Sequence, residues 1–140
     1  MKIINVVGAA ILKDNKILVS KRKEDKILGN LWEFPGGKVE IGETPQMALK
    51  REIREEFHDE VIIGNQIGEA VNFTYQFGTV NLTVFFARLK SNNLDLTVHS
   101  KVKWSIKEDL IKFNWAQADK PVVDALLKID LQKVFFNENG

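Results

Sequence analysis

The chain alternates between short apolar runs of extended character and segments with helical spacing. Near the N-terminus, residues 3–12 and 17–20 are apolar runs on either side of a polar turn, Lys13-Asp14-Asn15-Lys16, and this pattern predicts a pair of strands. Residues 21–30 are charged and predict a loop.

More strands are expected in the middle of the chain. Residues 61–63 and 67–77 have extended character, and residues 80–89 are rich in β-branched and aromatic side chains, so they predict the strongest strand. Gly78-Thr79 would form the hairpin turn between the last two segments.

Residues 44–57 predict one helix. Thr44 is a favourable N-cap, and Pro45 suits the first helical position. Apolar side chains at i, i+4 and i+8 form a stripe that would face the core: Leu49, Ile53 and Phe57, with Ala48 beside them.

The last third of the chain predicts two further helices. Trp104 begins another element, and Ser105 would cap a short helix after it. A final helix would begin near Asp119, with Pro121 in its first turn, and continue to Ile129. Strands before and after a carboxylate-bearing helix, with a second helix near the end, predict an α/β fold with a mixed β-sheet.

Length and composition narrow the classes of function. A chain of 140 residues, 44% of them hydrophobic, can bury a core as one domain over residues 1–140. It contains no cysteine, which suits a reducing cytosol, so we expect a cytoplasmic protein. No apolar run is long enough to span a bilayer, and the N-terminus lacks the features of a leader peptide. With 20 basic and 19 acidic residues, the net charge of +1 argues against a nucleic-acid-binding domain.

Three carboxylates gather on one face of the predicted helix. Glu52, Glu55 and Glu56 stand at i, i+3 and i+4, so their like charges repel unless a cation compensates them. Mg²⁺ fits this set, because it takes a few carboxylates and leaves its other positions to water and phosphates. A solvated acidic face, with Arg51 reaching Glu55, is the alternative. The glycines of Phe34-Pro35-Gly36-Gly37 favour a site, because they let the backbone approach a ligand closely.

The same residues resemble the signature of the Nudix hydrolase family. The matching positions are Gly37, Glu43, Arg51, Glu52, Ile53, Glu55 and Glu56. Only the last two positions depart from the signature, because His58 stands in place of a glycine and Asp59 in place of an aliphatic residue. A histidine tolerates the left-handed region better than most residues, so we expect His58 to end the helix, at a cost of at most about 1 kcal/mol.

The resemblance implies a Nudix-type α/β/α sandwich with a mixed β-sheet. It extends to residues 31–40 and 118–122, which are similar to the MutT-like branch that clears damaged or surplus nucleoside triphosphates. The implied reaction is attack of a metal-activated water on a phosphorus, which gives a nucleoside monophosphate and pyrophosphate. The implied metal is Mg²⁺, or Mn²⁺ in its place, held by the Gly37 carbonyl and by Glu52, Glu55 and Glu56.

The resemblance also implies supporting catalytic roles. Arg51 would orient Glu55 or Glu43, and Glu43 would be a structural acid of the loop rather than the general base. Family members often carry an acidic residue shortly before the tryptophan that matches Trp104, but this chain has none there. The base would then be His99 or one of the signature glutamates.

Four residues are candidates for binding the nucleotide: Arg22, Glu33, Phe34 and Asp119. The resemblance places Asp119 where the branch reads the base. An ionised carboxylate favours an exocyclic amino group such as that of cytosine, whereas a protonated one can also donate, which keeps oxidised purines open. Asp119 could also cap the last helix, either as its only role or together with a contact to the base. Glu33 and Phe34 could contact and stack the base, although Phe34 could equally belong to the core, and Arg22 could meet a phosphate or sugar or be simply exposed.

Other functions compete with hydrolysis of nucleoside triphosphates. Within the family, the substrate could be ADP-ribose or a dinucleoside polyphosphate. Outside it, the missing acid before Trp104 keeps a catalytically silent nucleotide-binding module open. Phe135 and Phe136 either pack on the domain or mark a partner surface, so we expect a monomer or a homodimer.

Overall fold

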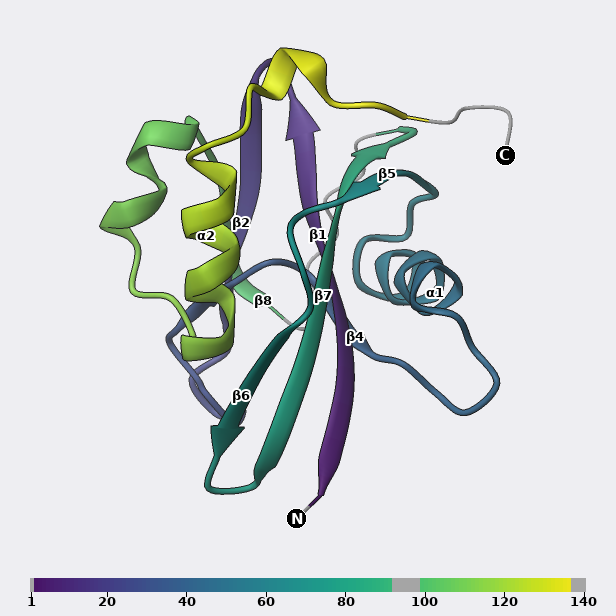
Figure 1. The fold of residues 1–140 in the computed structure, drawn as a ribbon, viewed down its shortest axis with the longest axis vertical. Helices are drawn as coiled ribbons and strands as arrows, with labels where there is room; N and C mark the ends of the chain where they lie inside the picture. Colours follow the sequence, from purple (N-terminus) through teal and green to yellow (C-terminus); the bar gives the residue numbers. More distant parts are fainter. Residues whose placement is uncertain (1, 92–98, 137–140) are drawn as a thin grey trace.

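The computed structural model of the protein, in which residues 2–91 and 99–136 are described, is built around a mixed β-sheet (Figure 1). Several short strands pair with the long strands of this sheet. In chain order the strands are β1 (Ile3–Lys13), β2 (Lys16–Arg22), β3 (Trp32–Glu33), β4 (Gly36–Lys38), β5 (Val61–Gln66), β6 (Val71–Tyr75), β7 (Gly78–Leu89) and β8 (His99–Ser105).

Strand β1 connects the two halves of the sheet. It runs parallel to β7, in a register from Ile3↔Thr79 to Ile11↔Ala87, and antiparallel to β2 and β4. β7 also pairs with β5 and β6, and β2 pairs with β3 and β8, all antiparallel. The sheet is therefore mixed, as predicted.

Helices cover both faces of this sheet, because alternate residues of a strand point to opposite sides. One face packs against α1 (Pro45–Phe57), and the other against α2 (Lys120–Leu126) and the 3₁₀ helix η1 (Lys107–Lys112) (Figure 1). On β7, Phe85, Ala87 and Leu89 face α1, whereas Val84 and Phe86 face the side of α2. This arrangement confirms the predicted α/β/α sandwich.

Helix α1 forms for the reasons that its sequence indicates. The Thr44 Oγ1 atom accepts a hydrogen bond from Met47 N at 3.1 Å, and Pro45 is the first helical residue. At the other end His58 adopts left-handed angles, φ 53° and ψ 42°, and its N–H donates to the Arg54 carbonyl. The apolar stripe is fully buried: Ala48, Leu49, Ile53 and Phe57.

The first hairpin also agrees with its prediction. Asp14 and Asn15 take positive φ angles of 51° and 64° between β1 and β2. Two consecutive positive values are the requirement of a type I′ turn, whose twist suits a hairpin. The predicted loop after β2 starts later than expected, since the strand extends to Arg22.

The second hairpin turn was placed wrongly at Gly78-Thr79. The turn is formed by Gln76 and Phe77, whereas Gly78 pairs with Tyr75 as the first residue of β7. The glycine suggested a turn, but Gly78 uses its freedom differently. It has a φ of 145° as a residue of the strand.

Two predicted helix ends are also wrong. Trp104 lies inside β8 and does not begin a new element, and Ile106 rather than Ser105 occupies the N-cap of η1. The Ser105 hydroxyl donates to the Ile106 carbonyl instead. Helix α2 ends at Leu126 and not at Ile129, because the chain tightens there into turns in which Ile129 N bonds to Leu126 O.

The two phenylalanines near the C-terminus differ. Phe135 is largely exposed, whereas Phe136 packs on the sheet and lies under the Arg88 guanidinium, 4.7 Å from the ring centroid. Among the described residues, no helix is long and apolar enough to cross a membrane.

The left-handed C-cap of α1 leads to a stability prediction. Replacing His58 with glycine should raise the free energy of unfolding by about 0.5 to 1 kcal/mol, because glycine has no Cβ to disfavour this conformation. Chemical denaturation monitored by circular dichroism would measure the change. His58→Ala keeps the Cβ and should give no gain, so an equal gain in both variants would contradict the explanation.

Candidate active site

Arg51 is the centre of the charged cluster on α1. Its guanidinium makes a bidentate pair with Glu43, at 2.8 Å from Nε to Oε2 and 2.9 Å from Nη2 to Oε1. It also donates to Glu52 Oε1 at 2.9 Å, to the Lys38 carbonyl at 2.9 Å and to Glu55 Oε2 at 3.4 Å. One cation therefore ties the loop before the helix to two of the three carboxylates on its face.

The loop acid Glu43 is held firmly in its ionised form. Its pKa is lowered to about 2, mainly by the hydrogen bond from Arg51 and then by the one from the Glu40 N–H. A carboxylate of such low basicity is a poor proton acceptor. The geometry therefore supports the structural role predicted for Glu43.

Gly37 brings the backbone of β4 against the helix. A Cβ built at this position would lie 2.3 to 2.5 Å from the carboxyl atoms of Glu52, so no other residue fits without displacing that carboxylate. Glycine is required here for steric reasons and not for its backbone angles. Gly36 and Gly37 do not have positive φ, whereas Gly42 does. The Gly37 backbone and the Glu52 carboxylate are thus adjacent, as a shared ligand set requires.

Glu56 is the most deeply buried of the three helix carboxylates, with 3% of its surface exposed. Burial is the main reason why its pKa is raised to about 9, and the negative charges of Glu52 and Glu33 add to the effect, while Arg22 opposes it. Burial also raises the pKa of Glu52, against the opposing effect of Arg51. A cation at this face would reverse both shifts.

The chemistry of this cluster fits a hard divalent cation. Its donors are carboxylate and carbonyl oxygens, the ligands that Mg²⁺ prefers. Within residues 2–91 and 99–136, however, no group of three His, Asp or Glu side chains is arranged to hold a metal ion as the side chains stand. Instead, Glu52 and Glu55 both accept hydrogen bonds from Arg51.

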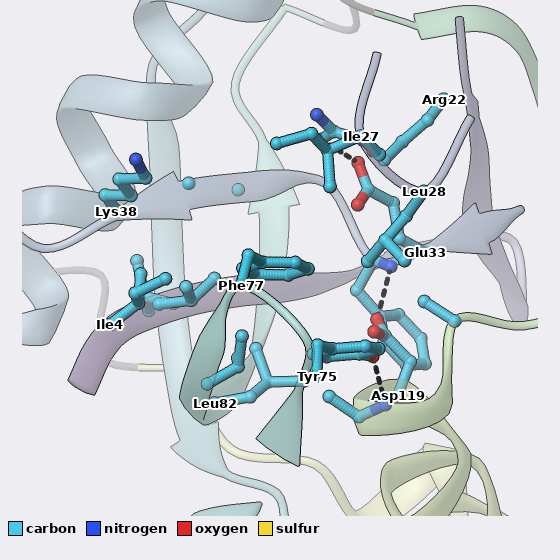
Figure 2. A pocket seen from close by; sticks show the side chains of 18 of the residues that line it. Ile4, Arg22, Ile27, Leu28, Glu33, Lys38, Tyr75, Phe77, Leu82 and Asp119 are labelled. Atoms are coloured by element: carbon cyan, nitrogen blue, oxygen red, sulfur yellow. Dashed lines mark hydrogen bonds and ion pairs between the residues drawn. The ribbon is translucent and has the colours of Figure 1, made fainter. Parts of the chain in front are cut away.

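A cavity of about 360 Å³ opens beside this cluster (Figure 2). Gly37 lines it and so belongs both to the cavity and to the carboxylate cluster. The cavity brings together all four residues predicted to bind substrate, which come from β2, β3, the turn before β4, and the 3₁₀ turn η2 (Gln117–Asp119): Arg22, Glu33, Phe34 and Asp119.

Arg22 is not simply exposed, as one interpretation of the sequence allowed. Its Nη1 atom pairs with Glu33 Oε2 at 3.3 Å, and its Nε atom donates to the Ile27 carbonyl at 2.8 Å. This pairing fixes a positive and a negative group at the rim of the cavity and holds the loop that carries Leu28, whose φ is 61°. Both charged groups are oriented before any ligand arrives.

Asp119 does not cap the last helix. It occupies the position before α2, but its side chain makes no capping bond there; its Oδ2 atom instead accepts a hydrogen bond from Phe34 N at 3.1 Å. Only 7% of Asp119 is exposed, and burial is the first cause of a pKa raised well above the ordinary value, with Glu33 adding to the shift. The neutral acid, which can donate as well as accept, is therefore favoured at this position.

Phe34 belongs mainly to the core. It is 4% exposed, and its ring stacks on Trp115 at a centroid distance of 4.8 Å. Although Phe34 also lines the cavity, its burial and its stacking agree better with the interpretation that it belongs to the core.

The structure adds cavity residues that the sequence analysis missed. Lys38 lies at the end next to α1, Tyr75 lies at the opposite end near Asp119, and Phe77 lies between them (Figure 2). The Tyr75 and Phe77 rings stack at 5.0 Å with an interplanar angle of 7°. The alternation of aromatic and polar residues in Phe73-Thr74-Tyr75-Gln76-Phe77 was the available signal. The backbone of His99 lies in β8 and pairs with the backbone of Arg22.

Comparison with known proteins agrees with this architecture. The chain matches the family model of the NUDIX domain over residues 6–125. It is 32% identical to the CTP pyrophosphohydrolase of Escherichia coli strain K12, over 92% of this chain and 95% of that protein. It is 31% identical to the 8-oxo-dGTP diphosphatase of Buchnera aphidicola subsp. Schizaphis graminum, over 97% and 98%. Among solved structures, the MutT protein of methicillin-resistant Staphylococcus aureus 252, a member of the Nudix hydrolase family, superposes with a TM-score of 0.74 at 45% identity, over 90% of this chain and 96% of that one.

The raised pKa of Glu56 predicts a pH-dependent gain in stability for Glu56→Gln in metal-free buffer. Between an unfolded pKa of 4.5 and a folded pKa of about 9, the unfolded state releases a proton that the folded state keeps, so wild-type stability falls as pH rises. Glutamine does not titrate. At pH 7 the variant should therefore be more stable by roughly 3 kcal/mol, a difference that disappears near the unfolded pKa.

Thermal unfolding in the presence of a chelator, measured from acid to neutral pH, would check this. Glu60→Gln is the matched control, because Glu60 is exposed and its pKa is lowered by the hydrogen bond from Arg54. This control should lose a little stability at neutral pH. A gain for Glu56→Gln that does not change with pH would rule out the titration of Glu56 as its cause.

Proposed function

We propose a function for this chain from the fact that it belongs to the Nudix hydrolase family. The chain hydrolyses nucleoside triphosphates to a nucleoside monophosphate and pyrophosphate, and so removes damaged or surplus nucleotides from the pool. The relatives named CTP pyrophosphohydrolase and 8-oxo-dGTP diphosphatase support this substrate class, since both match over nearly the whole chain. The cytoplasm, where such nucleotides occur, is the proposed compartment.

The observation that carries the proposal is the junction at Gly37. One side of this residue lies against Glu52 on α1, and the other side lines the cavity that holds Arg22, Glu33 and Asp119. A triphosphate chain directed toward α1 would therefore leave its base at the end of the cavity near Asp119. Lys38, at the α1 end, would meet phosphate oxygens.

The proposed metal ligands are the Gly37 carbonyl and the side chains of Glu52, Glu55 and Glu56, with Mg²⁺ as the metal and Mn²⁺ as a substitute. Bound there, the ion supplies acidity to a coordinated water and positive charge that offsets the leaving pyrophosphate. Arg51 positions the set, since it holds Glu52 and Glu55 while Glu43 and the Lys38 carbonyl fix its own orientation.

In the reaction, a water oxygen bonds to a phosphorus of the triphosphate while the bridging P–O bond to the pyrophosphate group breaks. The proton of the water passes to a general base. One of the α1 glutamates is a candidate base, because burial raises the pKa of Glu52 above its ordinary value. His99 is the other candidate, since its backbone pairs with that of Arg22 at the cavity.

The extent of the domain is part of the proposal. The family model ends at residue 125, but Leu126, Ile129 and Phe136 pack on the same core. We therefore propose that residues 1–140 form one domain. The predicted oligomeric state is a monomer or a homodimer.

The test is a panel of substrates incubated with Mg²⁺, in which release of pyrophosphate and of phosphate is measured separately. The panel contains the common ribo- and deoxyribonucleoside triphosphates, 8-oxo-dGTP, modified cytidine triphosphates, ADP-ribose and a dinucleoside polyphosphate. We expect pyrophosphate from one or two triphosphates. Turnover of ADP-ribose or the dinucleoside alone would move the chain to another Nudix substrate class, and no turnover at all would indicate a silent binding module.

Glu55→Gln should lower metal-dependent turnover about 100-fold or more without loss of stability, because it removes one charge from the ligand set at an exposed position. The steady-state rate at saturating Mg²⁺ and the thermal midpoint would be compared with those of wild type. Glu60→Gln, which changes an exposed carboxylate paired with Arg54, should keep the wild-type rate. Equal rates for Glu55→Gln and wild type would remove Glu55 from the metal site.

A further inference from the structure

Tyr75, the last residue of β6, has a side chain that is fixed in place at the cavity (Figure 2). Phe77 stacks on its ring at 5.0 Å, and Phe73 packs against it at 4.7 Å with an interplanar angle of 55°. A ring held by two neighbours has little conformational entropy left to lose when its hydroxyl meets a ligand. Its position therefore favours a contact of defined geometry.

The Tyr75 hydroxyl already acts as an acceptor. Ala118 N donates to its oxygen at 2.8 Å. A phenol carries one proton, and this bond does not use it. The Ala118 bond leaves this proton available, and Tyr75 lines the cavity, so the proton can be donated to a ligand there. Burial raises the pKa of Tyr75 further above its ordinary value, which keeps the donor protonated at neutral pH.

The carboxyl of Asp119 lies close to this hydroxyl (Figure 2), near enough to influence the pKa of Tyr75. The two groups are anchored in the same way. Phe34 N donates to Asp119 Oδ2, as Ala118 N donates to the Tyr75 oxygen. Each backbone bond fixes one side of a polar group and leaves its other side for a ligand, so this end of the cavity offers two adjacent hydrogen-bonding groups.

We propose that Tyr75 determines base specificity: its hydroxyl donates a hydrogen bond to a ring nitrogen or carbonyl oxygen on the edge of the nucleobase that meets Asp119. This inference rests on the proposed function and deepens it. A base that presents an N–H at that position would place donor against donor and leave a buried group unpaired, so it would be rejected. The preferred substrates are triphosphates whose base carries an acceptor there.

Tyr75→Phe tests the proposal, because it keeps the stacked ring and removes only the hydroxyl. For the preferred triphosphate of the panel, kcat/KM should fall about tenfold, mainly through a higher KM, since the bond is made in both ground and transition states. For the disfavoured triphosphates the change should be less than about twofold. The ratio of preferred to disfavoured kcat/KM is therefore the measured quantity.

Thr74→Val is the matched control. It removes a hydroxyl from the neighbouring residue of β6, which is exposed, bonds to Thr79 Oγ1 at 2.9 Å and does not line the cavity. Its preference ratio should equal that of wild type.

The outcomes separate a role in recognition from a structural role. An equal fall of kcat/KM for every triphosphate, with a lowered thermal midpoint, would show that the hydroxyl only holds Ala118 and would overturn the proposal. An unchanged preference ratio in Tyr75→Phe would also overturn it. Absence of pyrophosphate release by the wild-type protein would instead overturn the proposed function on which the inference rests.

Discussion

The interaction on which the site depends is the contact of Arg51 with Glu43, Glu52 and Glu55. Three carboxylates on one face of α1 and a fourth in the loop before it would repel one another strongly without a cation. Arg51 lies among them, and its planar set of donors satisfies Glu43 in two places while it still reaches Glu52 and the Lys38 carbonyl. A lysine could offer the charge but not this fixed arrangement. The loop, β4 and the helix are consequently held in one register before a metal or a phosphate arrives.

The two ends of the cavity are formed by different sets of residues. Substitutions at one end can therefore leave the other end unchanged. The charged cluster beside the α1 end is formed by residues close together in sequence, from Gly37 to Glu56, and these are the groups proposed for chemistry on a phosphate. The end near Asp119 is assembled from β6, η2 and the turn before β4, through contacts such as that of Asp119 with Phe34 and that of Tyr75 with Ala118. Under the proposed function, substitutions in this second set would alter the base that is accepted while the carboxylate cluster keeps its geometry.

The same difference explains which features the sequence could predict. The caps of α1, its buried stripe and the reach of Arg51 to Glu55 follow from local spacing, and the structure agrees with them. The contact of Arg51 with Glu43 was implied by the family resemblance, and the structure contains it as well. Tyr75 was missed because its importance depends on a contact with Ala118, which no local pattern reveals. The role of Asp119 as a cap was wrong for a similar reason, since its partner Phe34 is far away in sequence. The turn at Gly78 failed because a glycine with positive φ can also begin a strand.

The two buried acids show where the fold loses stability for the sake of its function. Glu56 and Asp119 both lie in surroundings that favour their neutral forms, Glu56 beside other carboxylates and Asp119 near Glu33. Apolar residues of similar size would make a more stable protein at these positions, so stability alone does not account for the two carboxyls. A ligand does account for both: a cation at Glu56 would restore the charge that burial disfavours, and a base edge at Asp119 would use the donor that burial favours. The surroundings of Glu56 thus suit a cation, and the surroundings of Asp119 suit a hydrogen-bonding partner.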